Sequence, residues 1–312
     1  MIFLNNSELK TEKKPYSTVT SQELQKLDRE GYLILKRDRK FWKSMNIEIN
    51  EVIELVEKYI KEFQVRMDKS AITDDTYKYE EGTNRISNLL GKNKIFQKFV
   101  AIPDIIACVK LVLGEKFQLS SFGLREPFKG FGQQGLHLDW KQRKSISDPF
   151  YQLTAFILLD NVDFKNGPPR IIPGSHNNMV NIVSTSRFKG KRKHSDNIVI
   201  EKKDKEESIS LTGKTGDIFF INVNAFHGGS LNKSGKRRRL LHLDYRARNE
   251  RPQLDHYDAI PKEYHSNFTP YEKYLLKLRR KSPKEKIIRF LYHKRDNFLI
   301  SKALKLKKII NL

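Results

Sequence analysis

The sequence predicts a mainly β protein with flanking helices, in which the strands form a sandwich or a barrel. From about residue 116 to about residue 250, short runs rich in Phe, Ile, Leu and Thr alternate with Gly, Pro and Asn. Before and after that stretch, apolar residues recur at the spacing of a helix. A chain of 312 residues can bury one full-sized core and carry an appendage.

The first third of the chain is expected to be mostly helical. The first predicted helix has Ser21 as its capping residue and stops at Gly31. Residues 32–36 then form a short predicted strand. A longer helix is expected over 48–67, where apolar residues recur on one face, and a short buried helix over 103–114.

The middle of the chain contains seven predicted strands. They cover residues 117–124, 136–140, 151–160, 169–174, 197–201, 216–222 and 239–245. Helical patterns return after about residue 250, with a Ser-x-x-Glu capping box at 282–285. We therefore expect one domain over residues 1–250 and a basic amphipathic helical extension over 251–312.

The charge of the chain is strongly positive, at +23, and much of the excess lies near the C-terminus. Residues 273–312 contain 14 Lys or Arg and two acidic residues, a net charge of +12. This segment predicts an anionic partner, and its interleaved aliphatic residues favour an anionic membrane surface over nucleic acid. A solvated helical tail whose apolar stripe packs on the domain is the alternative.

The cysteine count and the lengths of the apolar runs indicate the cellular compartment of the protein. The single cysteine excludes an internal disulfide and fits a reducing compartment. No apolar run approaches the ~18 residues that a membrane span needs, and the first residues do not form a signal-peptide core. We expect a cytoplasmic protein with possible peripheral membrane contact and no disulfide partner.

Four of the eight histidines begin the pattern His-x-Asp, so the pattern alone does not identify a site. On a strand, residues i and i+2 point to the same face, and the pattern then directs an imidazole and a carboxylate at one point. The pair at His194 lies in a basic loop, and the pair at His256 lies beyond the strands. We expect both to be at the surface. The two remaining pairs begin at His137 and His242.

The first of these pairs has a suitable distant partner. His227 follows a hydrophobic strand and precedes two glycines, 88 residues after Asp139. Two histidines and one carboxylate form the facial triad of non-haem iron(II) enzymes. His137, Asp139 and His227 are therefore the predicted ligands. The alternative is a hydrogen-bonded His–Asp pair that binds no metal.

An arginine near the distant histidine strengthens this choice. Arg238 lies eleven positions after His227, and a guanidinium suits a cosubstrate with a free carboxylate. Strand alternation places Arg238 on the same face as His242 and Asp244, toward the interior. Arg237 and Arg239 share the other face, which is apolar and would pack against helices. The pair at 242 and 244 is then interpreted as a pair that supports the metal ligands or as a buried hydrogen-bonded pair, and the alternative is a second metal site.

These residues lie in segments that resemble the phytanoyl-CoA dioxygenase family of iron(II)- and 2-oxoglutarate-dependent oxygenases. The resemblance covers about residues 21–250. It rests on GYLILK, RISNLLGKNKIFQKFVAIPDIIACVKLVLG, QQGLHLDW, NGPPRIIPGSH and FHGGSLNKSGKRRRLLHLDY. It implies a double-stranded β-helix, a cupin-like jelly-roll barrel with N-terminal helices packed on one sheet and a helical C-terminal tail.

The resemblance also implies roles for individual residues. His137, Asp139 and His227 match the iron triad, and Arg238 matches the arginine that binds 2-oxoglutarate. The other residues expected to contact the cosubstrate are Gln134, Thr154, Phe156 and Ser230. The alternative for Gln134 is a hydrogen bond at the start of a strand, and the alternative for Phe156 is core packing. The implied cofactors are Fe(II), 2-oxoglutarate and O2. Gly167, Gly174, Ser175 and His176 are expected to form a structural loop.

The function expected on these grounds is hydroxylation of a small or carrier/lipid-linked metabolite, with release of succinate and CO2. Two other classes of function stay open at this point. One is an oxygenase that acts on nucleic acid or another polyanion, which the positive charge suggests. The other is a non-enzymatic jelly-roll binding module, which loss of a triad residue would have favoured.

Overall fold

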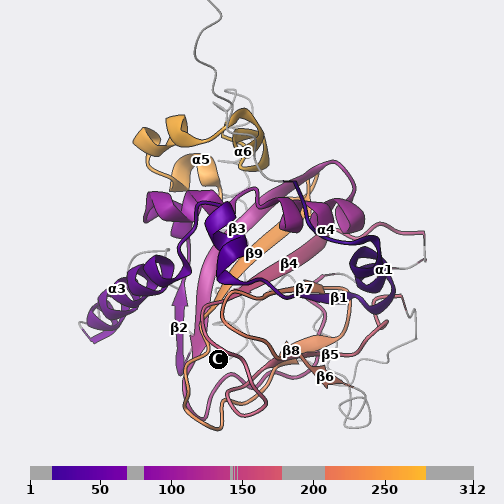
Figure 1. The fold of residues 1–312 in the computed structure, drawn as a ribbon, viewed down its shortest axis with the longest axis horizontal. Coiled ribbons are helices and arrows are strands. Elements are labelled where there is room, and N and C mark those ends of the chain that lie inside the picture. The colour runs from indigo at the N-terminus through magenta and orange to yellow at the C-terminus, as the bar shows by residue number, and fades with distance from the viewer. Residues whose placement is uncertain are drawn as a thin grey trace, which may run out of the picture.

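The computed structural model describes residues 16–68, 81–140, 143, 145, 147–177 and 208–278, with only the backbone of 63–68. Two antiparallel sheets form its centre (Figure 1). The six-stranded sheet has the order β1-β7-β4-β9-β3-β2. Its strands are β1 (Tyr32–Leu35), β2 (Thr83–Ile86), β3 (Phe117–Pro127), β4 (Gln152–Leu158), β7 (Ile218–Asn222) and β9 (Leu240–Ala247).

A three-stranded sheet completes the β structure. It has the order β6-β5-β8 and contains β5 (Pro169–Ile171), β6 (Ile209–Ser210) and β8 (His227–Gly229). Antiparallel sheets with helices packed against them are consistent with the expected jelly roll. Across the described residues, strand pairing does not join the two sheets into a closed barrel.

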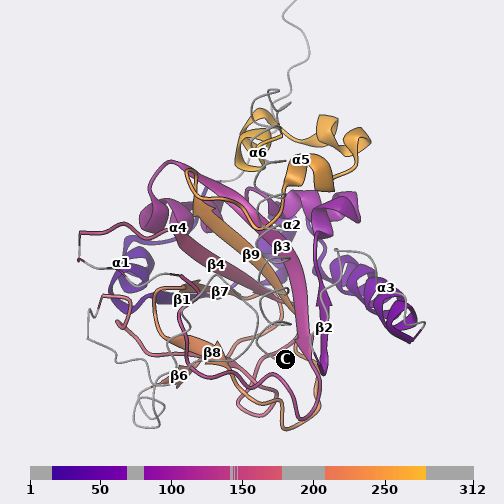
Figure 2. The same ribbon diagram turned by 180° about the vertical axis from the view of Figure 1, so that it is seen from behind.

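Helices cover one face of the six-stranded sheet (Figures 1 and 2). The α-helices are α1 (Ser21–Glu30), α2 (Arg39–Ser44), α3 (Ile49–Asp68), α4 (Pro103–Leu113), α5 (His256–Ala259) and α6 (Pro270–Leu275). The described residues also contain the short 3-10 helices η1 (Leu89–Gly91), η2 (Lys94–Phe99) and η4 (Lys262–Asn267). The predicted helices at 21–30, 48–67 and 103–114 are therefore confirmed within a residue or two at each end.

The cap of α1 differs from the expected one. Thr20, not Ser21, has extended backbone angles and forms a capping box with Glu23. The Glu23 amide donates to Thr20 Oγ1 over 3.2 Å, and the Thr20 amide donates to the Glu23 carboxylate over 2.7 Å. The prediction of Ser21 was wrong because the reciprocal Thr-x-x-Glu pair begins one residue earlier. Gly31 ends the helix with φ 74°, as expected.

Strand β9 separates two apolar clusters, as its alternation predicts. Leu241, Leu243 and Tyr245 are fully buried in the cluster shared with the helices. The Tyr245 hydroxyl donates to the Val100 carbonyl over 3.0 Å on that side. Leu240 belongs instead to the cluster between the two sheets. The predicted assignment of β9 residues to the face that packs on the helices and to the face toward the interior is therefore confirmed.

One predicted strand is absent and another cannot be judged. Residues 136–140 form only an isolated bridge from His137 to His227, so the strand prediction there was wrong. Within this segment, His137 exchanges backbone hydrogen bonds with His227 and the Asp139 amide donates to the Val223 carbonyl, and these contacts do not form a continuous ladder. The predicted strand at 197–201 lies outside the described residues.

The C-terminal region is described only to residue 278. Its helices α5 and α6 lie together at one end of the six-stranded sheet (Figure 2). Ile260, Phe268, Leu275 and Leu276 are buried in the same cluster as the N-terminal helices. The boundary at residue 250 stays a prediction, and the capping box at 282–285 lies outside the described residues. Across the described chain, no helix has the length and hydropathy needed to cross a bilayer.

The capping assignment can be tested by two matched substitutions. Thr20→Ala removes the hydroxyl that accepts the Glu23 amide, so we expect a loss of about 1 kcal/mol in unfolding free energy. Ser21→Ala alters an exposed hydroxyl in the first turn and should change stability by less than about 0.5 kcal/mol. Urea unfolding measures both, and a larger loss for Ser21→Ala would contradict the assignment.

Candidate active site

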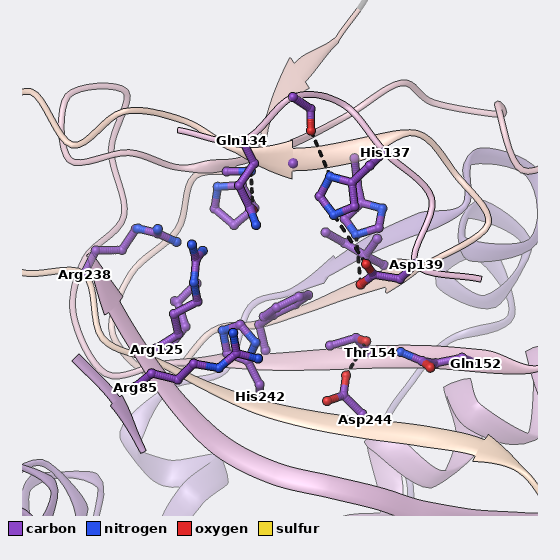
Figure 3. A pocket seen from close by; sticks show the side chains of 18 of the residues that line it. Arg85, Arg125, Gln134, His137, Asp139, Gln152, Thr154, Arg238, His242 and Asp244 are labelled. Carbon is purple, nitrogen blue, oxygen red and sulfur yellow. Dashed lines mark hydrogen bonds and ion pairs between the residues drawn. The ribbon is translucent and has the colours of Figure 1, made fainter. Parts of the chain in front are cut away.

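A cavity of about 490 Å³ opens beside the six-stranded sheet, and residues from both sheets line it. β4, β7 and β9 supply its floor, β8 and the 133–139 segment supply its upper wall, and β2 and β3 supply one side. Figure 3 shows the labelled side chains converging on this space. It contains all three predicted metal ligands.

His137, Asp139 and His227 converge at one end of the cavity. The Nε2 atom of His137 lies 3.4 Å from Asp139 Oδ1, and Nε2 of His227 lies 3.6 Å from Oδ2. One ligand atom from each residue lies within 4.8 Å of the other two. In the described part of the chain, this is the only group of three or more such side chains.

The backbone fixes which imidazole nitrogen faces the carboxylate. His137 Nδ1 lies 2.8 Å from the Gly135 carbonyl oxygen, and His227 Nδ1 lies 2.9 Å from that of Ala225. A carbonyl oxygen can only accept, so each Nδ1 carries the proton and each Nε2 keeps its lone pair. Two Nε2 donors and one carboxylate are the donor set of a two-histidine-one-carboxylate iron(II) site, so the residues fit that metal.

Asp139 and His137 also stabilise each other's charge. Burial opposes ionisation of Asp139, but hydrogen bonds from the protonated forms of His137 and His227, in which Nε2 also carries a proton, outweigh this effect and hold the pKa of Asp139 well below its usual value. Burial lowers the pKa of His137, and the hydrogen bond with Asp139 more than offsets it, so this pKa lies above its usual value. Asp139 is therefore an anion at neutral pH, as a metal ligand must be.

The opposite wall of the cavity is cationic. Arg238, Arg125 and Arg85 line it, and Figure 3 shows them across the cavity from His137 and Asp139. His242 lies beside Arg85 in the same view, with its ring edge-on to Phe156 at 4.6 Å between centroids. Burial first, and then the positive charges of Arg125, Arg85 and Arg238, hold the pKa of His242 well below its usual value.

The second His-Leu-Asp segment has a different role from the first. Asp244 accepts hydrogen bonds from the Thr154 and Ser121 hydroxyls, each over 2.7 Å. Both carboxylate oxygens are thus engaged with neighbouring strands β4 and β3. His242 and Asp244 face the interior as the alternation predicts, and Asp244 serves as a hydrogen-bond acceptor between strands.

Residues 19–240 match the sequence profile of the family described as Phytanoyl-CoA dioxygenase (PhyH). The chain belongs to the phytanoyl-CoA dioxygenase family. This membership places it among the 2-oxoglutarate-dependent dioxygenases, which use Fe(II), 2-oxoglutarate and O2.

Three named relatives agree with this family. A probable alpha-ketoglutarate-dependent hypophosphite dioxygenase from Stutzerimonas stutzeri is 30% identical over 65% of this chain and 73% of its own length. Dioxygenase olcK from Penicillium canescens is 26% identical over 70% of this chain and 71% of its own. The ectoine dioxygenase of Bordetella bronchiseptica is 22% identical over 69% of this chain and 71% of its own length.

Of the four other residues predicted to contact the cosubstrate, three line the cavity and one does not. Gln134, Thr154 and Phe156 line the cavity. The Gln134 side-chain oxygen accepts the Gly229 amide over 3.0 Å, which fixes its position beside β8. Ser230 is not among the lining residues, and its amide donates to the Pro168 carbonyl over 3.0 Å.

Two other histidines lie outside the cavity. His176 is buried in the loop after β5, with Nε2 2.9 Å from the Asp28 carbonyl oxygen, which agrees with a structural loop. His256 was expected at the surface, and this prediction was wrong because it is only 3% exposed. The chain after β9 folds back over β3 and brings His256 Nε2 to 3.1 Å from the Leu119 carbonyl oxygen. His194 lies outside the described residues.

Sequence reasoning did not identify Arg85 and Arg125. Arg85 lies on β2, a four-residue strand that the sequence does not mark. Arg125 lies one residue past the predicted end of the strand at 117–124, whereas β3 continues to Pro127. Extending the alternation from Gly123 would have pointed Arg125 toward the interior.

Proposed function

We propose that this chain oxidises a small molecule at an iron(II) ion held by His137, Asp139 and His227, with 2-oxoglutarate as cosubstrate. The observation that carries this proposal is the convergence of two Nε2 donors and one carboxylate within 4.8 Å. The bound metal would supply the activation of dioxygen that carbon hydroxylation requires. The expected products are a hydroxylated substrate, succinate and CO2.

The protein's own contribution is geometry. Hydrogen bonds to the Gly135 and Ala225 carbonyls hold both imidazole rings in the tautomer that presents Nε2 to a metal. Arg238 is 2% exposed on the far wall and would bind the distal carboxylate of 2-oxoglutarate. Gln134, Thr154 and Phe156 would contact the cosubstrate between these two points. The apolar side chains of Phe156, Ile221 and Leu240 reduce the water that can enter.

The size of the cavity favours a small substrate. A space of about 490 Å³ must hold 2-oxoglutarate and the substrate together. Two relatives are named for small molecules, hypophosphite and ectoine, which supports the same class. A lipid-linked substrate stays a prediction. Membrane contact through 273–312 also stays a prediction, because residues 279–312 lie outside the described part of the chain.

The arrangement of the two sheets is part of the proposal. We interpret them as the two faces of a double-stranded β-helix, with the 133–139 segment docked beside β8. Apolar residues of both sheets pack in one cluster between them, as in a jelly roll. The segment after residue 250 is proposed as a helical C-terminal extension, whose first part packs on the same core as the N-terminal helices.

Iron binding tests the ligand assignment directly. We expect His137→Ala, Asp139→Ala and His227→Ala each to weaken Fe(II) binding by more than about tenfold, because each removes one donor. His242→Ala is the matched control, since it alters a histidine in the same cavity outside the triad. Anaerobic titration measures the affinity. Loss of binding in the control, with binding retained by His137→Ala, would identify the wrong His-Leu-Asp segment.

Cosubstrate affinity tests the arginine assignment. Arg238→Ala should weaken 2-oxoglutarate binding by roughly 100-fold or more, because a charge-assisted bidentate contact is lost. Arg237→Ala should change it by less than about threefold. Arg237 lies on the helix side, where it pairs with Glu57 and Glu126. Calorimetry measures both constants, and equal effects would contradict the assignment.

A further inference from the structure

Three surface loops meet at one end of the two sheets. The first follows β3, the second follows β4 and the third precedes β9, over residues 128–132, 161–167 and 231–237. The three strand ends are adjacent, because β9 pairs with β4 on one side and with β3 on the other. Helices α5 and α6 lie at the opposite end of β3 (Figures 1 and 2).

Backbone hydrogen bonds join the three loops into one surface. The Asn232 amide donates to the Phe131 carbonyl over 2.9 Å, and the Asn232 carbonyl accepts the Gly130 amide over 2.8 Å. The Lys165 carbonyl accepts the Lys233 amide over 2.8 Å. The third loop therefore holds the other two, and the side chains of all three keep fixed relative positions.

This surface exposes apolar rings. Phe128, Phe131 and Phe164 are 42%, 38% and 74% exposed, and among the described side chains every exposed phenylalanine lies in these loops. The Phe131 ring lies against Gly82, where a side chain would collide with it. Large apolar side chains that gather on one exposed surface are typical of an interaction site.

The same surface is positively charged. Its exposed lysines are Lys129, Lys165, Lys233 and Lys236. Asp163 is the one acidic residue in the sequence of the three loops, so the four lysines and this aspartate give a net charge of +3. The remaining cation, Arg237, is already paired with Glu57 and Glu126. The exposed rings are therefore surrounded by charges that attract an anionic partner.

We propose that residues 128–132, 161–167 and 231–237 form a docking surface for an anionic lipid bilayer. The phenyl rings enter the boundary between headgroups and acyl chains, and the lysines contact the lipid phosphates. Lysines supply the charge that lies outside the ion pairs of the described residues. Nucleic acid recognition favours arginine, which binds phosphate through two hydrogen bonds and stacks on bases, so lipid is the better match.

The docking surface borders the cavity of the metal triad. The first loop continues into Gln133 and the third continues into Arg238, and both of these residues line the cavity. A bilayer bound at the loops would therefore lie beside that cavity. The docking surface is separate from the predicted basic extension over 251–312, whose first helices lie at the other end of β3.

An indole placed in the docking surface tests the contact locally. Full-length Phe164→Trp is titrated with vesicles of equimolar phosphatidylcholine and phosphatidylserine, and the wild-type protein, with Trp42 and Trp140, gives the background emission. We expect the emission of the variant to move to shorter wavelength, because the introduced indole leaves water. Lipids brominated on their acyl chains should quench it. Vesicles of phosphatidylcholine alone should bind at least about tenfold more weakly.

Further substitutions in the Phe164→Trp background separate the charge of the docking surface from the charge of the whole chain. Lys165→Gln combined with Lys236→Gln should weaken binding to the anionic vesicles about tenfold. Phe128→Ser should weaken it to a similar extent, roughly tenfold, because a ring no longer enters the bilayer. The matched control combines Lys40→Gln with Lys116→Gln, two exposed lysines outside the loops, and should change binding by less than about threefold.

Three results would overturn the docking surface. The first is an unchanged emission of Phe164→Trp with anionic vesicles at low salt, including the case in which the protein sediments with the vesicles through residues 273–312. The second is an equal loss of binding for the two pairs of lysine substitutions. The third is a change in emission with a single-stranded oligonucleotide and none with vesicles, which would assign the surface to nucleic acid. Thermal unfolding confirms that each variant is folded.

Discussion

The backbone pairing between His137 and His227 is the contact on which the whole site depends. The amide of each residue donates to the carbonyl of the other, over 2.9 and 3.1 Å. The two segments are far apart in sequence, and this single bridge sets both imidazole rings side by side at 4.7 Å between centroids. A third backbone bond, from the Asp139 amide to Val223, adds the carboxylate to the same point. The metal-binding geometry therefore comes from main-chain hydrogen bonds, which hold the ligands in place before a metal binds.

The alternation of β9 connects this site to the rest of the protein. One face of the strand buries Leu241, Leu243 and Tyr245 against the helices, and the other carries His242 and Asp244 into the cavity. A register slip by one residue would exchange these two sets and would bury charge in the core. The packing of the helices on the sheet thus also fixes where the cavity residues point. The register of β9 therefore determines both the packing of the core and the placement of the cavity residues.

The parts of the site that the sequence predicted have local signals. His137 and Asp139 are two positions apart, and the alternation that places Arg238 inside can be read along one strand. Arg85 and Arg125 meet through the pairing of β2 with β3, and a register between distant segments leaves no local pattern. The opposition of Arg85 and Arg125 across the two strands could therefore be found only in the folded chain.

Two of the three errors have the same physical origin. His256 lies in a polar stretch past the last strand, and its burial depends on how that stretch returns over β3. Ser21 was preferred over Thr20 although the Thr-x-x-Glu spacing from Thr20 to Glu23 is a local signal of a capping box, which the contacts of the two residues confirm. Residues 136–140 have the composition of a strand, yet their backbone forms isolated hydrogen bonds and not the continuous ladder of a strand pair. For His256 and for residues 136–140, a contact between distant segments decided the local structure.

Nitrogen-15 NMR of the histidine side chains tests the central claim most directly, using protein loaded with Zn²⁺ as a diamagnetic substitute. We expect two histidines, assigned by substitution to His137 and His227, to coordinate through Nε2 and to carry a proton on Nδ1. The Gly135 and Ala225 carbonyls would hold those protons. Coordination through Nδ1 in either residue, or a metal-bound signal that disappears in His242→Ala, would contradict the assignment of the site.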